Sequence, residues 1–186
     1  AVPADYDGDG RTDVAVFVRA TGEWYVWPWT GQWGIASWGW NGAEPIPADY
    51  DGDGKADLAV FDRLNGRWYV CAYHGNVLVW DLHWGWSSAV VLPADYDGDG
   101  RADFGVYDPA TGCWYILDAD QKLMVWALPW GSSQMVPVPA DYDGDGRADF
   151  AVYAPLTGNW YIWTWSGLSY TDLRWGYHPM EPVIRG

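Results

Sequence analysis

Short runs of hydrophobic residues, separated by polar turns, recur along the whole chain. The apolar run Val14–Phe17 leads to a Thr-Gly turn and then to a second run that begins Trp24-Tyr25. A third segment ends in Trp38-Gly-Trp40. Runs of this length, rich in β-branched and aromatic residues and bounded by glycine and proline, are typical of β-strands. No stretch has the 3.6-residue periodicity of an amphipathic helix, so the pattern predicts an all-β protein.

The same order of segments occurs four times. The first strand of each copy is expected at Val14–Phe17, Leu58–Phe61, Phe104–Tyr107 and Phe150–Tyr153. The turn that follows is marked by Gly22, Gly66, Gly112 and Gly158, and the second strand begins at Trp24, Trp68, Trp114 and Trp160. A short run with prolines, such as Glu44–Pro47, fits a further strand or a strand entry. Each copy thus contains four short strands.

Four copies account for the entire chain. We predict a single repeat domain, 1–186, with units at about 1–43, 44–89, 90–135 and 136–186. A period of 44 to 46 residues indicates a propeller, a solenoid or an array, in which no copy buries its hydrophobic face alone. The sequence therefore predicts a β-propeller of four four-stranded blades. The alternative is part of a larger propeller or an open repeat array.

Acidic residues are concentrated in one loop of each copy. The chain has 25 acidic and 10 basic residues, and 16 of the carboxylates follow the spacing D-x-D-x-D-G-x-x-D. The rest of the chain is nearly neutral. A net charge of −15 excludes a nucleic-acid partner, and a hydrophobic content of 49% excludes a disordered acidic tail. The loop carboxylates are Asp5, Asp7, Asp9, Asp13, Asp49, Asp51, Asp53, Asp57, Asp95, Asp97, Asp99, Asp103, Asp141, Asp143, Asp145 and Asp149.

Four carboxylates in a nine-residue loop repel one another unless a cation lies among them. Ligands at loop positions 1, 3, 5 and 9, with a glycine at position 6 that aims the position-7 carbonyl inward, suit a hard cation of the size of Ca²⁺. Magnesium would need fewer protein ligands and more water. The position-7 residues, expected to bind through backbone oxygen only, are Arg11, Lys55, Arg101 and Arg147. We expect about four calcium ions, one per repeat.

The EF-hand is the obvious alternative for such a loop, and it needs a bidentate Glu at position 12. That position instead holds Val16, Val60, Val106 and Val152, which continue an apolar strand. The loop followed by an apolar strand resembles the FG-GAP (VCBS-type) repeats of integrin α-chain propellers and of many secreted bacterial proteins. The resemblance covers all four units and implies that the loop joins the first two strands of a blade and that its aspartates bind calcium. The best-known members have seven blades and longer units, so the short repeats here resemble the bacterial branch.

Ring closure is not fixed by the repeat. The segment Glu181–Ile184 resembles the lead-in Glu44–Pro47, as at the start of a further unit. The segment closes a four-bladed ring, or the chain is a piece of a longer array, or two chains assemble into a larger ring. We expect closure within one chain, because exposed terminal blades would leave edge strands and apolar faces in water.

No catalytic constellation stands out, and we predict a protein that is not an enzyme. The histidines, His74, His83 and His178, are unmatched between units, and no paired carboxylates remain outside the metal loops. Cys71 and Cys113 do not occupy equivalent positions, and we expect free thiols. Without a start methionine or a signal peptide, the chain is expected to be a mature or excised segment. Calcium loops suit an extracellular or cell-surface location.

Seventeen tryptophans exceed what four small cores need. Four of them share one position of the repeat and are expected to pack between blades: Trp24, Trp68, Trp114 and Trp160. Four are nearly repeated before a glycine and are open to packing or to ligand contact: Trp38, Trp84, Trp130 and Trp175. The fold does not require the remaining nine, which are the candidate ligand-binding residues: Trp27, Trp29, Trp33, Trp40, Trp80, Trp86, Trp126, Trp163 and Trp165.

Two functions are consistent with these features. Exposed indole rings flanked by Asp, Asn and Gln suit sugars, whose C–H faces stack on indole while the hydroxyls bond to polar neighbours. The first hypothesis is a non-catalytic, calcium-binding and lectin-like module that binds glycans outside the cell. The alternative is a structural or adhesive segment of a larger secreted or cell-surface protein, which mediates protein–protein contact or self-association. No apolar run reaches 18 residues, so no membrane span is expected.

Overall fold

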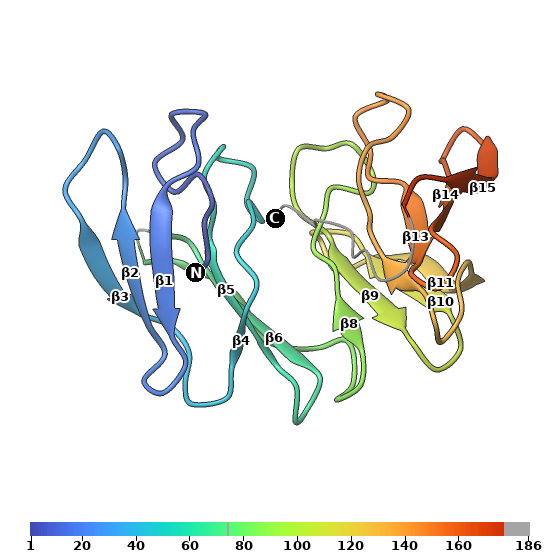
Figure 1. Ribbon diagram of the computed structural model, residues 1–186. Coiled ribbons are helices and arrows are strands. Elements are labelled where there is room, and N and C mark those ends of the chain that lie inside the picture. Colours follow the sequence, from blue (N-terminus) through green and yellow to red (C-terminus); the bar gives the residue numbers. More distant parts are fainter. Residues whose placement is uncertain (74, 177–186) are drawn as a thin grey trace. The chain divides into compact units, whose positions relative to one another are not determined.

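The computed structural model describes residues 1–73 and 75–176, which form strands joined by turns and loops, with no helix among them (Figure 1). The chain divides into two compact units. The first is formed mainly by Ala1–Val91, and the second mainly by Leu92–Asp99 and the chain from Asp103 onward. Each unit is built around two sheets, in which the strands lie in chain order.

The first unit contains a three-stranded and a four-stranded sheet. The three-stranded sheet comprises β1 (Val14–Val18), β2 (Glu23–Trp27) and β3 (Gly34–Ser37). The four-stranded sheet comprises β4 (Glu44–Pro45), β5 (Leu58–Asp62), β6 (Arg67–Cys71) and β7 (Val77–His83). The first two long strands of each sheet pair antiparallel in the same register, with Val14 opposite Trp27 and Leu58 opposite Cys71. The two sheets are therefore copies of one unit.

The second unit repeats this arrangement. One sheet comprises β9 (Phe104–Asp108), β10 (Cys113–Leu117), β11 (Leu123–Pro129) and, from the end of the first unit's range, β8 (Val90–Val91). The other comprises β12 (Val136–Pro137), β13 (Phe150–Ala154), β14 (Asn159–Trp163) and β15 (Ser169–Arg174). Here the equivalent register places Phe104 opposite Leu117 and Phe150 opposite Trp163.

The predicted fold class is confirmed: the chain is all-β, and its four repeated sheets are blades of the propeller type. In the first sheet, three strands are described, and no counterpart of β4 is among them. Val2 nevertheless donates a backbone hydrogen bond to Ala15 O (2.9 Å), as Ile46 does to Ala59 O (2.8 Å). The predicted closing segment, Glu181–Ile184, lies outside the described residues.

The core of the first unit lies between its two sheets. Alternate side chains of β1 and β2, among them Phe17, Trp24 and Val26, form one buried cluster with Leu58 and Val60 of β5. The whole of β5 is buried, because side chains on both faces of that strand are covered. Buried and exposed residues alternate along β1, whereas every residue of β5 is buried. The first sheet is therefore covered on one face and the second on both.

The repeated tryptophan is fully buried in the first three blades, in keeping with its predicted packing role, and half-buried in the fourth. Trp24, Trp68 and Trp114 have no exposed surface. The indole N–H of Trp68 donates to Trp84 O (2.5 Å), which ties the second strand to the turn after the third. The same bond recurs from Trp24 to Trp38 O, from Trp114 to Trp130 O and from Trp160 to Trp175 O. The tryptophan of each Trp-Gly motif is therefore held in place by this hydrogen bond, which its backbone carbonyl accepts.

Candidate functional site

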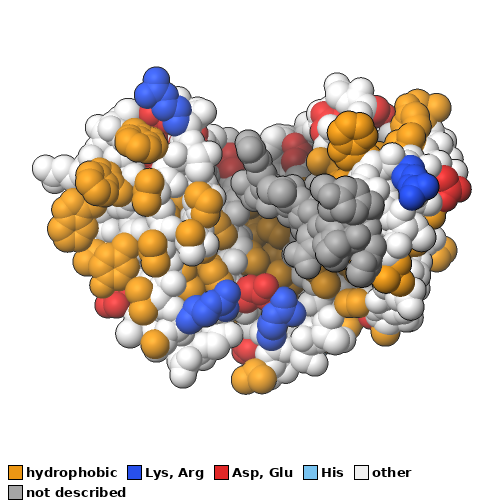
Figure 2. Space-filling view, viewed as in Figure 1, with side chains coloured by type: hydrophobic (Ala, Val, Ile, Leu, Met, Phe, Trp, Pro, Cys, Tyr) orange, Lys and Arg blue, Asp and Glu red, His pale blue; other side chains and the backbone are white. Residues whose placement is uncertain are grey.

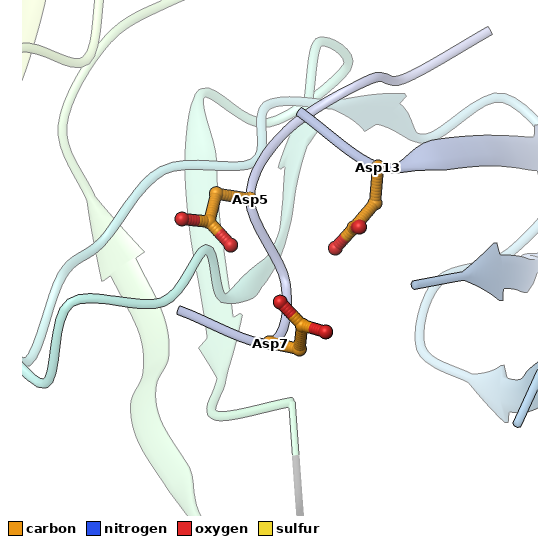
Figure 3. Close-up of side chains that lie close together, drawn as sticks. All are labelled: Asp5, Asp7 and Asp13. Atoms are coloured by element: carbon orange, nitrogen blue, oxygen red, sulfur yellow. The ribbon is translucent and has the colours of Figure 1, made fainter. Parts of the chain in front are cut away.

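The acidic loops lie where the repeat predicted them, between the short lead-in strand and the first long strand of each blade. In each loop, three aspartates bring one carboxylate oxygen each to within 4.8 Å of the others. Figure 3 shows Asp5, Asp7 and Asp13 of the first loop, whose side chains lie close together. The other groups are Asp49, Asp51 and Asp53, then Asp95, Asp97 and Asp99, and last Asp141, Asp143 and Asp149.

Backbone N–H groups hold the loop open around these carboxylates. Asp5 accepts hydrogen bonds from Gly8 N (2.7 Å) and Gly10 N (2.8 Å), and Asp9 accepts one from Arg11 N (2.9 Å). The bonds of the second and fourth loops repeat these. Gly8 and Gly10 have φ angles of 77° and 82°, a region that favours glycine. The glycines of the motif thus shape the loop.

The last aspartate of each loop is buried, with at most 1% of its surface exposed. Asp57 and Asp103 each accept a backbone hydrogen bond of 2.8 Å from the Tyr that follows the first loop aspartate. Burial and the neighbouring carboxylates nevertheless raise the pKa of Asp57 and of Asp103 to about 7. Without a cation, each of these loops therefore holds a carboxylate in an unfavourable environment.

The fourth loop supplies a further indication of a missing positive charge. Asp149 Oδ1 is buried and has no hydrogen bond of good geometry among the described residues, although the backbone N–H of Trp165 acts on the carboxylate and partly offsets the rise in its pKa that burial causes. A buried carboxylate oxygen without a partner is costly, and a directly bound cation removes that cost. The oxygen-only donor set fits Ca²⁺, and the loop aspartates are the residues that would hold it. The predicted contribution of the carbonyls of Arg11, Lys55, Arg101 and Arg147 stays a prediction.

The loop before the third strand lies over the metal loop in the first and fourth repeats. Thr30 Oγ1 donates to Asp7 Oδ2, and Ser166 Oγ donates to Asp143 Oδ2 (3.2 Å). The indole N–H of Trp29 donates to Thr12 O and that of Trp165 to the equivalent carbonyl of Ala148, both at 3.0 Å. Trp29 and Trp165, two of the candidate ligand residues, are therefore also anchored to the metal loops.

Three of the nine candidate tryptophans line one pocket in the second unit. Trp126 of β11 is 68% exposed, and with the half-buried Trp163 and Trp165 it borders a cavity of about 460 Å³. Phe150, Thr164 and further residues of β11, from Met124 to Pro129, complete the lining. A cavity of this volume with aromatic walls is typical of small-ligand sites.

A second aromatic group lies within the first unit, where Trp38 and Trp40 meet the next blade. The rings of Trp40 and Trp80 both pack edge-on against Tyr69, with centroids 5.0 and 5.2 Å away. Tyr69 Oη donates to Asp81 (2.7 Å). Burial and that hydrogen bond raise the pKa of Tyr69 to about 12, so its hydroxyl stays protonated at neutral pH.

The remaining candidates do not line the pocket of the second unit. Trp27 and Trp33 are about two-thirds exposed on the first sheet, where they border a second cavity. Trp86 is half-buried after β7. The structure therefore brings together Trp126, Trp163 and Trp165, and separately Trp40 and Trp80, out of the predicted set.

Sequence reasoning missed Asp81 and its equivalents. Asp81, Ala127 and Asp172 have φ angles of 64°, 56° and 59° and occupy bulges where the second and third strands shift register. In the fourth repeat Asp172 accepts a hydrogen bond from Tyr161 Oη (2.9 Å), as Asp81 does from Tyr69. The available signal was the Tyr of each Trp-Tyr pair together with an acid eleven or twelve residues later, and Ala127 breaks that pattern.

These features define a class of protein, an all-β repeat protein whose blades each carry an acidic loop of the metal-binding type. The chain belongs to the FG-GAP-like repeat family, which matches residues 5–60, 49–106 and 95–152. No curated protein matches the sequence. Within the described residues, no helix has the length and hydropathy needed to span a membrane.

Two solved structures are similar to the chain. One is a lectin of Agrocybe aegerita that specifically recognises non-reducing terminal N-acetylglucosamine, with 19% identity, a TM-score of 0.63, and 92% of this chain matched to 51% of the lectin. The other is the V. cholerae biofilm matrix protein Bap1, with 21% identity, a TM-score of 0.42, and 91% of this chain matched to 30% of Bap1. The chain thus spans about half the length of the lectin, and that likeness shows a shared fold.

Proposed function

We propose that the protein is an extracellular, calcium-stabilised and non-catalytic module that binds glycans. The observation that carries the proposal is the pocket of the second unit, in which Trp126, Trp163 and Trp165 line one cavity of about 460 Å³. Indole faces stack on the C–H faces of sugar rings. The bulge at Ala127 interrupts the strand ladder beside this pocket.

The repeat itself argues that these tryptophans serve a ligand. The position of Trp163 is occupied by Leu117 and Cys71 in the two preceding repeats, since all three pair with the first residue of their sheet's first long strand. The fold therefore accepts smaller residues there. The lectin of the same fold recognises non-reducing terminal N-acetylglucosamine. That sugar is the first ligand to test.

The aspartate loops support the calcium part of the proposal. Bound calcium would neutralise the loop carboxylates and supply the partner that Asp149 Oδ1 lacks among the described residues. Trp165 lines the pocket and donates to Ala148 O, next to Asp149, so an ordered fourth loop fixes one wall of the pocket. Glycan affinity is therefore expected to depend on calcium.

Calorimetric titration of the calcium-loaded protein with oligosaccharides that end in N-acetylglucosamine, followed by a glycan array, tests the proposal. We expect saturable binding at one pocket per chain and a change in tryptophan emission, because the indole rings are half-exposed to exposed. Folded, calcium-loaded protein that binds no glycan on the array would overturn the proposal.

A specific observation also favours the second candidate, an adhesive or structural segment. The outer face of the first sheet exposes large apolar side chains, among them Trp27 and Ile35 at 64% and 51%. Apolar faces of this kind mark interaction surfaces. Glycan binding and self-association use different parts of the chain and do not exclude each other.

A further inference from the structure

The outer face of the first sheet is an exposed apolar surface that no other part of the first unit covers. Val14 and Val16 of β1 and Tyr25 and Trp27 of β2 are 40–64% exposed, and they line a cavity of about 440 Å³. Figure 2 shows hydrophobic side chains spread over the surface formed by β1–β3, at the left of the view. No charged residue interrupts this lining, so its exposure to water is unfavourable.

The same face is buried in each of the other repeats. The positions of Val14 and Val16 are occupied by Leu58 and Val60 in the second repeat, which are 2% and 0% exposed. In the first unit, this burial is provided by the inner face of the preceding blade, since Phe17 and the repeated tryptophan pack with Leu58 and Val60. The partner that fits the outer face of β1–β3 is therefore another blade of this repeat.

A backbone hydrogen bond accompanies each blade-to-blade contact. The residue at loop position 8 donates its N–H to the carbonyl of the first aspartate in the preceding loop. The pairs are Ala56 with Asp5, Ala102 with Asp49 and Ala148 with Asp95, each at 2.6 Å. Among the described residues, the equivalent donor of the first repeat, Thr12 N–H, and the equivalent acceptor of the fourth, Asp141 O, make no such bond.

A basic side chain marks the same contacts. A β-carbon on Gly8 would lie 3.1 Å from Lys55 Cγ, because the position-7 side chain of the next repeat crosses the loop there. Arg101 lies over Gly52 and Arg147 over Gly98 in the same way. Gly144 of the fourth loop has no described atom within 4 Å of that point. The first repeat thus offers one half of this contact, at Arg11 and Thr12, and the fourth repeat offers the other.

We propose that these halves bind each other between two copies of the chain. The outer face of β1–β3 of one copy docks against the fourth repeat of a second copy, with Thr12 N–H bonded to Asp141 O and the Arg11 side chain over Gly144. A heterologous contact of this kind closes into a ring or extends, according to its rotation. The lectin of the same fold is about twice the length of this chain, which is the content of two copies.

Sedimentation velocity in calcium, over a wide range of protein concentration, tests the proposal. We expect concentration-dependent dimers or larger assemblies. Val16→Glu on the docking face and Gly144→Asn in the fourth loop are each expected to weaken association by about tenfold or more, since both act at the centre of the contact. A protein that stays monomeric at all concentrations, as expected if the chain covers its own face, would overturn the proposal.

Matched controls separate the contact from general damage. Gly42 also has positive φ, and a β-carbon there would meet no described atom within 4 Å, so Gly42→Asn should leave association unchanged. Leu64→Glu places the same charge on a turn residue that is 88% exposed, and it should also have no effect. Equal weakening by Gly144→Asn and Gly42→Asn would contradict the proposed contact.

A mixing experiment tests the head-to-tail geometry. Val16→Glu protein keeps an intact fourth repeat, and Gly144→Asn protein keeps an intact docking face. Their mixture is expected to form 1:1 heterodimers, although neither variant associates by itself. Failure of the mixture to associate, with both variants folded by circular dichroism, would show that two copies do not meet in this way.

Discussion

The side chains that depart from the repeat carry most of the information about function. Trp163 stands where Leu117 stands in the preceding repeat, and Trp165 stands two positions further along. Both line the aromatic pocket of the second unit. A large aromatic residue that lines a cavity, at a position where two other repeats have smaller residues, is best explained by a ligand.

Trp163→Leu is therefore expected to reduce glycan affinity by about tenfold or more, since aromatic residues commonly dominate binding energy. Stability should change little, because Leu117 occupies the same position in the third repeat. Calorimetric titration and thermal unfolding measure the two effects. Trp27→Leu alters the equivalent position of the first repeat, outside the pocket, and should leave glycan affinity unchanged. Unchanged glycan affinity of the Trp163→Leu variant would show that Trp163 does not contribute to the glycan site.

The buried aspartates give the metal-free protein an unusual dependence on pH. The pKa of Asp57 and of Asp103 is raised to about 7 in the folded chain, from an ordinary value of 3.8, mainly by burial. Between these values the folded state binds more protons than the unfolded state, so the free energy of unfolding falls as pH rises. In chelator, we expect the melting temperature to decrease from pH 5 to pH 7 and to level off above it.

Calcium should remove that decrease, because it binds the ionised carboxylates. Thermal unfolding in chelator and in excess calcium, at matched ionic strength, distinguishes the two behaviours. A melting temperature that rises with pH in chelator would contradict the burial of these carboxylates in the metal-free fold.

At the scale of the element, the turn between the first two long strands is fixed by a close backbone contact. Gly66 has a φ of 67°, and a β-carbon there would lie 2.2 Å from Gly85 O, in the Trp-Gly motif of the same blade. The same contact joins Gly22 to Gly39 and Gly112 to Gly131. The two glycine positions that punctuate the sequence therefore touch each other.

Gly66→Ala is expected to lower the free energy of unfolding by about 3 kcal/mol, the sum of backbone strain and the displacement of Gly85. Gly42 also has positive φ, at 94°, but no atom lies within 4 Å of its β-carbon position. Gly42→Ala should therefore cost only about 1 kcal/mol. Urea unfolding of both variants measures the difference. Equal losses of unfolding free energy would mean that backbone strain at positive φ, and not the contact with Gly85, sets the cost.

The sequence predicted the elements better than their irregularities. Strands, turns and acidic loops have local signals: alternation, Gly at positive φ and Asp at fixed spacing. The bulges do not, because they arise where Tyr69 alone is opposed by Trp80 and Asp81, a mismatch set by pairing across the sheet. The convergence of Trp126 with Trp163 likewise depends on how β11 and the next blade pack, which no local pattern contains.

At the scale of the whole molecule, four loops hold 16 of the 25 acidic residues, so the proposed metal binding would involve every repeat. Each loop is linked by a backbone hydrogen bond to the next one, at Asp5, Asp49 and Asp95. An ion that orders one loop therefore acts at a contact between blades. The family match of residues 5–152 covers all three of these links.

Removal of calcium is therefore expected to destabilise the entire protein. A ligand at 100 times its dissociation constant stabilises the native state by about 2.7 kcal/mol per site, so about four sites would raise the melting temperature by many degrees. Differential scanning calorimetry in chelator, in calcium and in magnesium measures the effect. Magnesium at the same concentration should restore little of it, because it retains its water and binds fewer protein oxygens. Identical transitions in chelator and in calcium would show that the aspartate loops do not bind the ion.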